Sequence, residues 1–418
     1  MIEKGKLNIV FDFLMSIVLI YCLVRFSLVM VAGMSLFSLV NVIIAGSSAV
    51  AYFAITNKNY RNEFLGLNSF LLICCILMVV LASVLTSRSN YADTASNYYK
   101  QLIVLMLIWG LYIYLRNCNK KNAGFFITLY LVCVSISAVY TAYVALIGGE
   151  DIIRLTASGV FDGKFAFLYG GFDFIYALVL IYTAILTVLL NMWKQIGVII
   201  RILLVILEIL FAFTIIVSGY GTAFTLILVF TLWQLIPKGV GSLITIVVIL
   251  VLVFVFPTLI TNAISAIPFI PELTSSRLNE LILSVSGQGS SAYITDDGQR
   301  MDRIVWSLKV FFENPIWGGY VGDTELSFGY HTEWIDQLAK YGLITTIFNA
   351  AFWMFTYKKI KKDTLMSEDS KISCKCFNNT FVMFVVLGFL DPISMVVTVC
   401  PLFILAPFLS AVARKEET

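Results

Sequence analysis

The chain has 418 residues, of which 60% are hydrophobic and 13% are charged, and its mean hydropathy is +0.93. This balance excludes an ordinary soluble domain and predicts an all-α polytopic membrane protein. The formal net charge is only +3, and the basic residues are spread between apolar segments, which argues against a nucleic-acid partner.

Twelve apolar runs of roughly membrane-spanning length follow one another along the chain. They lie near residues 8–30, 36–56, 64–86, 99–115, 124–147, 166–190, 196–217, 222–236, 240–260, 343–357, 378–391 and 393–412. The first run follows a basic start, MIEKGK, but no small-residue cleavage site comes after it. We therefore expect it to be retained as a helix in the bilayer.

Basic residues mark every second loop between these runs. Lys58, Arg61, Arg116, Lys194, Lys238 and the cluster 358–362 fall on the side of the N-terminal lysines. By the positive-inside rule, both termini are predicted to be cytoplasmic. The chain then divides into nine spans in residues 1–260, a large outer segment in residues 261–342, and three spans in residues 343–418.

The outer segment changes from apolar runs to amphipathic patterns. One short helix is predicted over 275–285, followed by a Gly/Ser-rich linker. A second helix is predicted from about 300 to Asn314-Pro315, with one apolar face formed by Met301, Ile304, Val305, Leu308, Phe311 and Phe312. A third helix is predicted to end at Gly342, with Trp334, Ile335 and Leu338 facing inward.

His331 is the only histidine in the chain and stands at the start of this third helix. The positive end of the helix dipole disfavours imidazolium there, so the ring is expected to be a neutral base near pH 7. This position favours a general base. The alternative is a capping or surface histidine with no chemical role.

Three arginines of the outer segment, Arg277, Arg300 and Arg303, are candidates for binding a diphosphate. A guanidinium group can bind phosphate oxygens through two hydrogen bonds and stabilise a leaving diphosphate without a metal. The alternative is contact with phospholipid headgroups only. Asp296-Asp297 lacks the third position of a DxD motif, and the CxC formed by Cys374 and Cys376 has no histidine nearby, so we expect no metal site and no cofactor.

Within the predicted spans, Asp173 is expected about two turns below the outer surface, and Glu208 near the middle of its helix. Ionisable groups inside a bilayer usually face an interior cavity, so both are candidate cavity residues. Arg201, near the inner end of the same helix as Glu208, can instead extend its side chain to the inner headgroups.

The order RMDRIVWSLKVFFENPIWGGYVGD followed by GYHTEWIDQLAKYGLI resembles the signature loop of Wzy-type O-antigen and capsule polymerases and the related O-antigen ligases. The shared pattern is an arginine ahead of an amphipathic helix, then Asn-Pro-x-x-Gly, then a histidine that opens a helix ending in Tyr-Gly-Leu. The pattern covers about residues 300–345. The rest of the likeness is twelve spans with one large, late outer loop.

This resemblance implies a metal-independent glycosyltransferase of the multi-helix C type at the outer face of the bacterial inner (plasma) membrane. The donor would be a glycan on undecaprenyl diphosphate, and the partner proteins would include a chain-length regulator and a flippase. The acceptor would be a lipid-linked repeat unit for a polymerase, or a lipid A core for a ligase.

The resemblance also assigns roles to residues. His331 would be the base for the acceptor hydroxyl, with Glu333 as the next candidate, and Arg303, then Arg277 and Arg300, would bind the diphosphates. The chain departs from the pattern in two places: SGYGT at 218–222 lacks an expected arginine, and His331 is followed by threonine where ligases have asparagine. The second departure favours a polymerase over a ligase.

Two other classes remain open from the sequence. A flippase or another transporter for lipid-linked oligosaccharides would also have about twelve spans, but its basic residues should line a cavity among them. A membrane scaffold without catalysis would tolerate the loss of His331.

Overall fold

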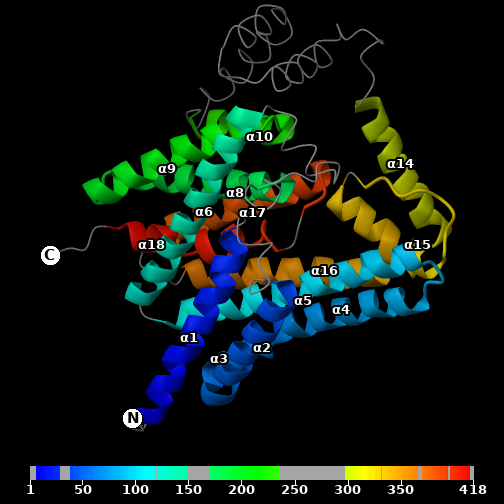
Figure 1. Cartoon of the computed structure of the whole chain (residues 1–418), viewed down its shortest axis with the longest axis horizontal. Helices are drawn as coiled ribbons and strands as arrows, with labels where there is room; N and C mark the ends of the chain where they lie inside the picture. The colour runs from blue at the N-terminus through cyan, green and yellow to red at the C-terminus, as the bar shows by residue number, and fades with distance from the viewer. Residues whose placement is uncertain are drawn as a thin grey trace, which may run out of the picture.

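The structure of the chain, a computed structural model shown in Figure 1, describes residues 6–28, 38–118, 120–148, 170–235, 297–330, 332–365, 370–393 and 396–414. Over these residues the fold is helical, and the only β-type pairing is an isolated bridge between Ile196 and Arg414. The described part of the chain is therefore all-α, as the composition predicts.

The first half of the described chain contains long helices and one short one. They are α1 (Lys6–Ser27), α2 (Leu39–Thr56), the short α3 (Lys58–Phe64), α4 (Leu67–Leu85), α5 (Ser89–Asn117), α6 (Lys120–Gly148), α8 (Phe172–Met192), α9 (Val198–Val217) and α10 (Gly221–Leu235). The second half contains α14 (Asp297–Glu313), α15 (Gly318–Val321), α16 (Glu333–Leu365), α17 (Ser370–Leu390), a π-helical turn η4 (Pro401–Leu405) and α18 (Leu409–Ala413).

Eight of the described helices are long and apolar enough to cross a membrane, namely α1, α2, α4, α5, α6, α8, α9 and α17. This confirms a membrane protein with several spans. Of the other predicted spans, 222–236 corresponds to the shorter apolar helix α10, 343–357 lies within α16, and 240–260 lies outside the described residues.

The predicted span 393–412 is not one continuous helix. The described residues form turns, η4 and the five-residue α18 instead. Pro401 and Pro407 explain the interruption, because proline has no backbone N–H to donate and its ring clashes with the preceding turn. Hydropathy alone detects the apolar character of this segment and misses the breaks.

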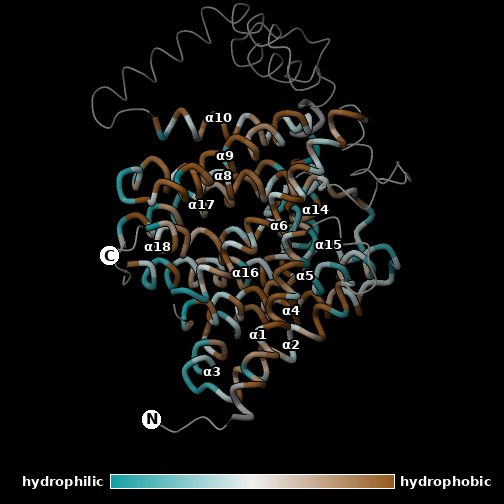
Figure 2. Tube along the Cα trace, turned by 60° about the vertical axis from the view of Figure 1, so that its left-hand side comes forward, coloured by the Kyte–Doolittle hydropathy of each residue, from teal (hydrophilic) through white to brown (hydrophobic). Residues whose placement is uncertain are grey.

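α8 is the most enclosed of the eight candidate spans and packs against α9, α10 and α17. In its apolar stretch 83% of the residues are buried, compared with 22% in α9. α9 instead exposes Ile199, Ile202 and Ile209, among other aliphatic side chains, as expected for a helix that faces lipid. Figure 2 shows hydrophobic residues along α8, α9 and α10, and hydrophilic residues along α3.

The described residues of the predicted outer segment, from 297 on, pack at one end of the bundle. α4, α5 and α16 lie side by side, and α14 and α15 cover the same end of this group (Figure 1). α16 contains a break at Gly342, where φ is 73° and ψ is −177°. This confirms Gly342 as the end of the third predicted helix, but a new helical stretch follows at once and continues to Leu365.

The break at Gly342 is held by the turn at residues 315–318. The Leu343 N–H donates to the Pro315 carbonyl oxygen at 2.9 Å. A Cβ atom on Gly342 would overlap the Ile316 carbonyl group, and one on Gly318, where φ is 81°, would overlap the Lys340 carbonyl group. Both positions therefore need glycine, for conformation and for space. The Asn-Pro-x-x-Gly and Tyr-Gly-Leu parts of the sequence pattern contact each other here.

Candidate functional site

Of the five residues predicted to act in the outer segment, the side chains of two are described. Arg303 lies on α14, and Glu333 is the first residue of α16. His331 and Arg277 lie outside the described residues, and Arg300 belongs to α14 but its side chain lies outside the described part. The site is therefore built from the described elements that flank these positions.

Asp336, on α16, connects this helix through hydrogen bonds to α14 and to the segment that precedes α16. One carboxylate oxygen accepts a hydrogen bond from the Ser307 hydroxyl on α14, and the other accepts the Thr332 backbone N–H at 3.1 Å. The Ser307 hydroxyl oxygen accepts in turn the Gly329 N–H at 2.9 Å. Because Asp336 is only 3% exposed, it holds Gly329 and Thr332 between α14 and α16 from inside the protein.

The segment before position 331 is pressed against α14. A Cβ atom on Gly329 would overlap the Arg303 carbonyl group, so only glycine permits this approach. Tyr330 has φ of 55°, a conformation that tyrosine rarely adopts, and the contacts on both sides of it must maintain it. Arg303 and the chain that leads to His331 are thus neighbours.

Glu333 lies in a second hydrogen-bonded group next to Asp336. One carboxylate oxygen accepts from the Gln337 side-chain amide, and the other accepts the Ile393 backbone N–H at 3.3 Å. The Gln337 amide oxygen accepts from Asn349, beyond the Gly342 break. Burial raises the pKa of the Glu333 carboxyl to about 7, against the opposing effect of the Lys340 ammonium group. Near neutral pH this carboxyl can therefore gain or lose a proton.

Lys340 supplies a positive charge close to these two carboxyl groups. Its ammonium nitrogen lies 4.4 Å from the centre of the Tyr330 ring, as in a cation–π contact. Burial lowers the pKa of Lys340, while Asp336 and Glu333 favour its charged form.

Aromatic rings join the N-terminal part of α5 to this region. Tyr91 stacks on Tyr320 with ring centres 4.8 Å apart, and Tyr98 stacks on Tyr341 at 5.1 Å. Phe328 packs edge-on against Tyr320 and Tyr91. Phe328 also packs edge-on against Tyr330, so these paired rings form a rigid wall beside it.

The loop that follows α15 is tied to the turn between α4 and α5. The Asp323 carboxylate accepts the Thr86 hydroxyl at 2.7 Å and the Ser87 N–H at 3.0 Å. These hydrogen bonds hold the pKa of Asp323 below its usual range. The loop therefore has fixed contacts at both of its ends, at Asp323 and at Thr332.

Sequence patterns missed the main residues of this arrangement. The predicted inward face of the third helix is incomplete: Trp334 packs against α17 and donates to the Val385 carbonyl oxygen at 2.9 Å, but the buried residues of the first turns are Asp336 and Gln337, while Ile335 and Leu338 are half-buried. The buried side of α14 carries Ser307 and Val310, while Val305 and Phe312 of its predicted apolar face are exposed. A useful signal was present: Thr332 and Asp336 are spaced as an N-cap residue and an acid in the first turn of a helix.

The intramembrane candidates lie elsewhere in the bundle. α8 begins at Phe172, so Asp173 is in its first turn, and its depth in a membrane stays a prediction. Glu208 is 9% exposed in α9, and its carboxylate accepts no hydrogen bond within the described part of the chain. Arg201 donates to the Ile196 carbonyl oxygen at 3.0 Å and lies 4.8 Å from the Trp193 ring centre.

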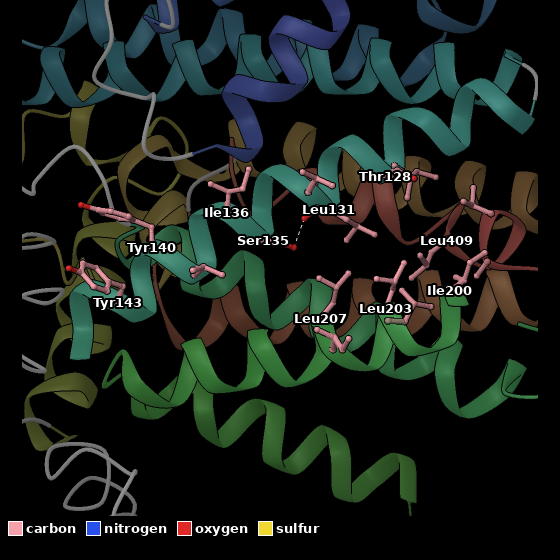
Figure 3. A pocket seen from close by; sticks show the side chains of 17 residues that line it. Thr128, Leu131, Ser135, Ile136, Tyr140, Tyr143, Ile200, Leu203, Leu207 and Leu409 are labelled. Atoms are coloured by element: carbon pink, nitrogen blue, oxygen red, sulfur yellow. Dashed lines mark hydrogen bonds between the residues drawn. The ribbon is translucent and has the colours of Figure 1, made fainter. Parts of the chain in front are cut away.

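A pocket of about 860 Å³ opens between α6 and α9, next to α18 (Figure 3). Side chains of α6 such as Leu131 and Ile136 face Leu203 and Leu207 of α9 across it. The Ser135 hydroxyl in its wall donates to the Leu131 carbonyl oxygen of its own helix at 2.6 Å. Neither Asp173 nor Glu208 lines this pocket, which suits a hydrocarbon chain better than a sugar.

No protein-family model matches the chain, and no curated protein matches it. Within the described residues, no group of three or more His, Cys, Asp or Glu side chains is placed to hold a metal ion. The geometry of the outer segment is therefore the basis for the functional conclusion.

Proposed function

We propose that the chain is a polysaccharide polymerase of the bacterial inner membrane, which transfers a growing glycan from undecaprenyl diphosphate to a lipid-linked repeat unit. The observation that carries the proposal is that the Arg303 backbone lies against Gly329, just before position 331, and that Thr332 and Glu333 follow this position at the start of α16, beside helices that can span a membrane. We infer that Arg303 supplies the cation for the diphosphate and that His331 or Glu333 supplies the proton acceptor for the sugar hydroxyl.

The proposed reaction is a displacement at the anomeric carbon of the donor glycan. The acceptor hydroxyl oxygen forms the new bond to this carbon, and the bond from the carbon to the diphosphate oxygen breaks. The hydroxyl proton passes to a base, for which we propose His331, with Glu333 as the second candidate because its pKa of about 7 suits proton transfer. Arg303 stabilises the negative charge that develops on the diphosphate, with Arg300 and Arg277 as further proposed contacts.

Exposed apolar side chains near Arg303 support a site at the membrane surface. Val305 and Phe312 on α14, and Ile316 and Trp317 just after it, are between 43% and 74% exposed. Large apolar side chains beside an arginine are suited to the boundary between headgroups and acyl chains. This surface would bring the diphosphate of a lipid-linked substrate to the level of Arg303.

The direct test is His331→Ala in the purified enzyme with lipid-linked repeat units. A general base contributes about 10²- to 10⁴-fold in rate, so we expect chain growth to fall by that range while the protein still inserts. His331→Gln should fail as well, since glutamine cannot accept the proton. In cells, a polymerase defect leaves single lipid-linked repeats, whereas a ligase defect leaves long unattached chains.

Arg303→Gln gives an independent test with a matched control. Lys309 is exposed on the same helix, so Lys309→Gln removes an equal charge from α14 outside the proposed site. We expect a large loss of chain growth only in Arg303→Gln. Normal chain growth with impaired translocation of the lipid-linked repeat would instead identify a flippase. Full activity of both His331→Ala and Arg303→Gln would favour a membrane scaffold without catalysis.

We also propose that the outer segment is extracytoplasmic and both termini are cytoplasmic. Ser327 is exposed in the loop before position 331, and Lys371 is exposed near the start of α17, at the opposite end of the bundle. In a variant without native cysteines, Ser327→Cys should react with an impermeant reagent in intact cells and Lys371→Cys should not. The reverse pattern would overturn the orientation.

A further inference from the structure

A second pocket, lined by charged side chains, lies near the C-terminal end of α16, far along the helix from Glu333. It has a volume of about 450 Å³ and is formed by side chains from α3, α4, α5 and α16. Its charged residues are Glu63, Arg116, Lys358, Lys359, Lys362 and Asp363. None of them belongs to the proposed glycan site, so this pocket is a separate candidate binding site.

Both acids of this pocket are already paired. Arg116 donates through Nη1 to a Glu63 carboxylate oxygen at 2.8 Å, and its Nε lies 3.2 Å from Asp363 Oδ2. The Tyr112 hydroxyl donates to the same Asp363 oxygen at 2.9 Å. Lys359 lies 3.9 Å from each acid. These contacts hold the side chains at the base of the pocket in place and neutralise its two carboxylates.

Lys358 and Lys362 are left without a counter-charge. They are exposed, lie one helical turn apart on α16, and form no ion pair within the described part of the chain. The pocket holds four cationic groups and two acids, which leaves an excess of two positive charges. Such an excess in a concave site attracts an anion with several oxygen atoms, most simply a phosphate group.

The place of the pocket in the bundle indicates where the phosphate comes from. α4 begins at Leu67, next to the pocket residue Asn68, and α5 ends one residue after Arg116. Both helices are candidate membrane spans, so the pocket lies at the level where their apolar parts end and lipid headgroups begin. Leu67 and Phe70 are exposed on the first turn of α4 and offer an apolar surface for an acyl chain.

We propose that this pocket binds the phosphate of an anionic phospholipid through Lys358 and Lys362, as a lipid site separate from the glycan site. Basic pockets between membrane helices bind such headgroups in general, and each surface lysine strengthens the attraction several-fold. The bound lipid would hold α4, α5 and α16 together at this end.

The test uses the purified full-length protein in detergent, with native mass spectrometry to follow bound phosphatidylglycerol and, separately, zwitterionic phosphatidylcholine. Lys358→Gln with Lys362→Gln leaves the paired core of Arg116, Glu63 and Asp363 in place, so folding should be retained. Lys361→Gln with Lys371→Gln is the matched control, since it removes two charges outside the pocket. We expect the pocket variant to bind phosphatidylglycerol about 10- to 30-fold more weakly, and the control within about twofold of the wild type.

Three results would overturn the proposal. One is equal binding of the two lipids by the wild type. Another is an equal loss of phosphatidylglycerol by both double variants, as expected for general surface charge. The third is a rise in the unfolding temperature of the wild type with inorganic phosphate as large as that with phosphatidylglycerol, which would reject a lipid as the source of the phosphate.

Discussion

The two ends of α16 hold their carboxyl groups in different ways. At the end near Glu333, the hydrogen-bond donors to the carboxylates are neutral: the Ser307 hydroxyl, the Gln337 amide and the backbone N–H groups of Thr332 and Ile393. Lys340 adds a positive charge nearby. At the end near Asp363, the partners of the acids are mainly the cations Arg116 and Lys359. The same helix therefore presents two distinct electrostatic environments.

This difference indicates different uses of the two ends. A buried carboxyl group with neutral partners can exchange a proton near neutral pH, as the pKa of about 7 for Glu333 indicates. Glu63 and Asp363 instead neutralise Arg116 and Lys359 in fixed ion pairs. The positive charges of Lys358 and Lys362 then remain to attract an anion. The first arrangement suits chemistry, and the second suits binding.

Gly342→Ala should have the largest effect on stability, because the backbone conformation at the break in α16 requires glycine. Alanine would have to adopt φ of 73° and would overlap the Ile316 carbonyl group. We expect a loss of about 3 kcal/mol or more in stability, measured by thermal unfolding in detergent. Gly197→Ala is the control, because a Cβ there meets nothing within 4 Å. Equal shifts in both variants would show that the break is not required.

Asp336→Ala should separate the positioning of residues 329–332 from the proton chemistry. Without this carboxylate, the Thr332 N–H and the Ser307 hydroxyl lose their acceptor, and the chain next to His331 is no longer held. A displacement of about 1 Å can cost about 10²-fold in rate, so we expect chain growth to fall by that order. The assay is glycan elongation by the purified enzyme.

Asp336→Asn and Asp302→Ala complete this experiment. Asparagine retains one acceptor oxygen and should recover part of the rate. Asp302 is exposed on α14, and its loss should have little effect. If Asp336→Ala elongates glycans at the normal rate, the positioning role is wrong.

Local signals in the sequence predicted where helices stop. Asn314-Pro315 and Gly342 end helical stretches as expected, because proline and a left-handed glycine act through their own backbone geometry. The long apolar runs likewise predicted the eight candidate spans of the described residues, but not the interruptions in the run at 393–412. These features depend on single residues or on average hydropathy, which can be read without knowledge of tertiary contacts.

The buried polar face of α16 could not be predicted in this way. Asp336 and Gln337 are buried because Ser307 and Asn349 supply partners, and periodicity assigns inward faces by hydrophobicity alone. For a similar reason α5 begins at Ser89, ten residues before the apolar run at 99. Its polar first turns are enclosed by Tyr320 and Thr324, which come from far along the chain.

Glu333→Gln should sharpen the contrast between the two ends through pH. The folded-state pKa of about 7 lies above the ordinary value of 4.5, so the folded protein binds more protons than the unfolded chain between these values. This contribution to stability is fully present below about pH 4.5 and is lost as the pH rises through about 7. Relative to Glu333→Gln, the wild type should lose up to about 3 kcal/mol between pH 5 and 8.

Thermal unfolding across this pH range measures the difference, with elongation rates recorded on the same samples. If ionised Glu333 takes up the hydroxyl proton, the wild-type rate rises with pH up to about 7 and the rise disappears in Glu333→Gln. A rise that persists in Glu333→Gln would assign the titration to another group, with His331 first. Parallel stability profiles for the two proteins would refute the raised pKa.

Removal of divalent metals should have the smallest effect of all. A hard cation such as Mg²⁺ needs several oxygen ligands in one place, but the oxygens of Glu333 and Asp336 already accept hydrogen bonds from four different groups. Arg303 would take the place of the metal in stabilising the diphosphate. We therefore expect the elongation rate in EDTA to stay within about twofold of the untreated rate. A loss of activity that magnesium or manganese restores would contradict this, and Asp296→Asn with Asp297→Asn would then test whether those adjacent acids supply the ligands.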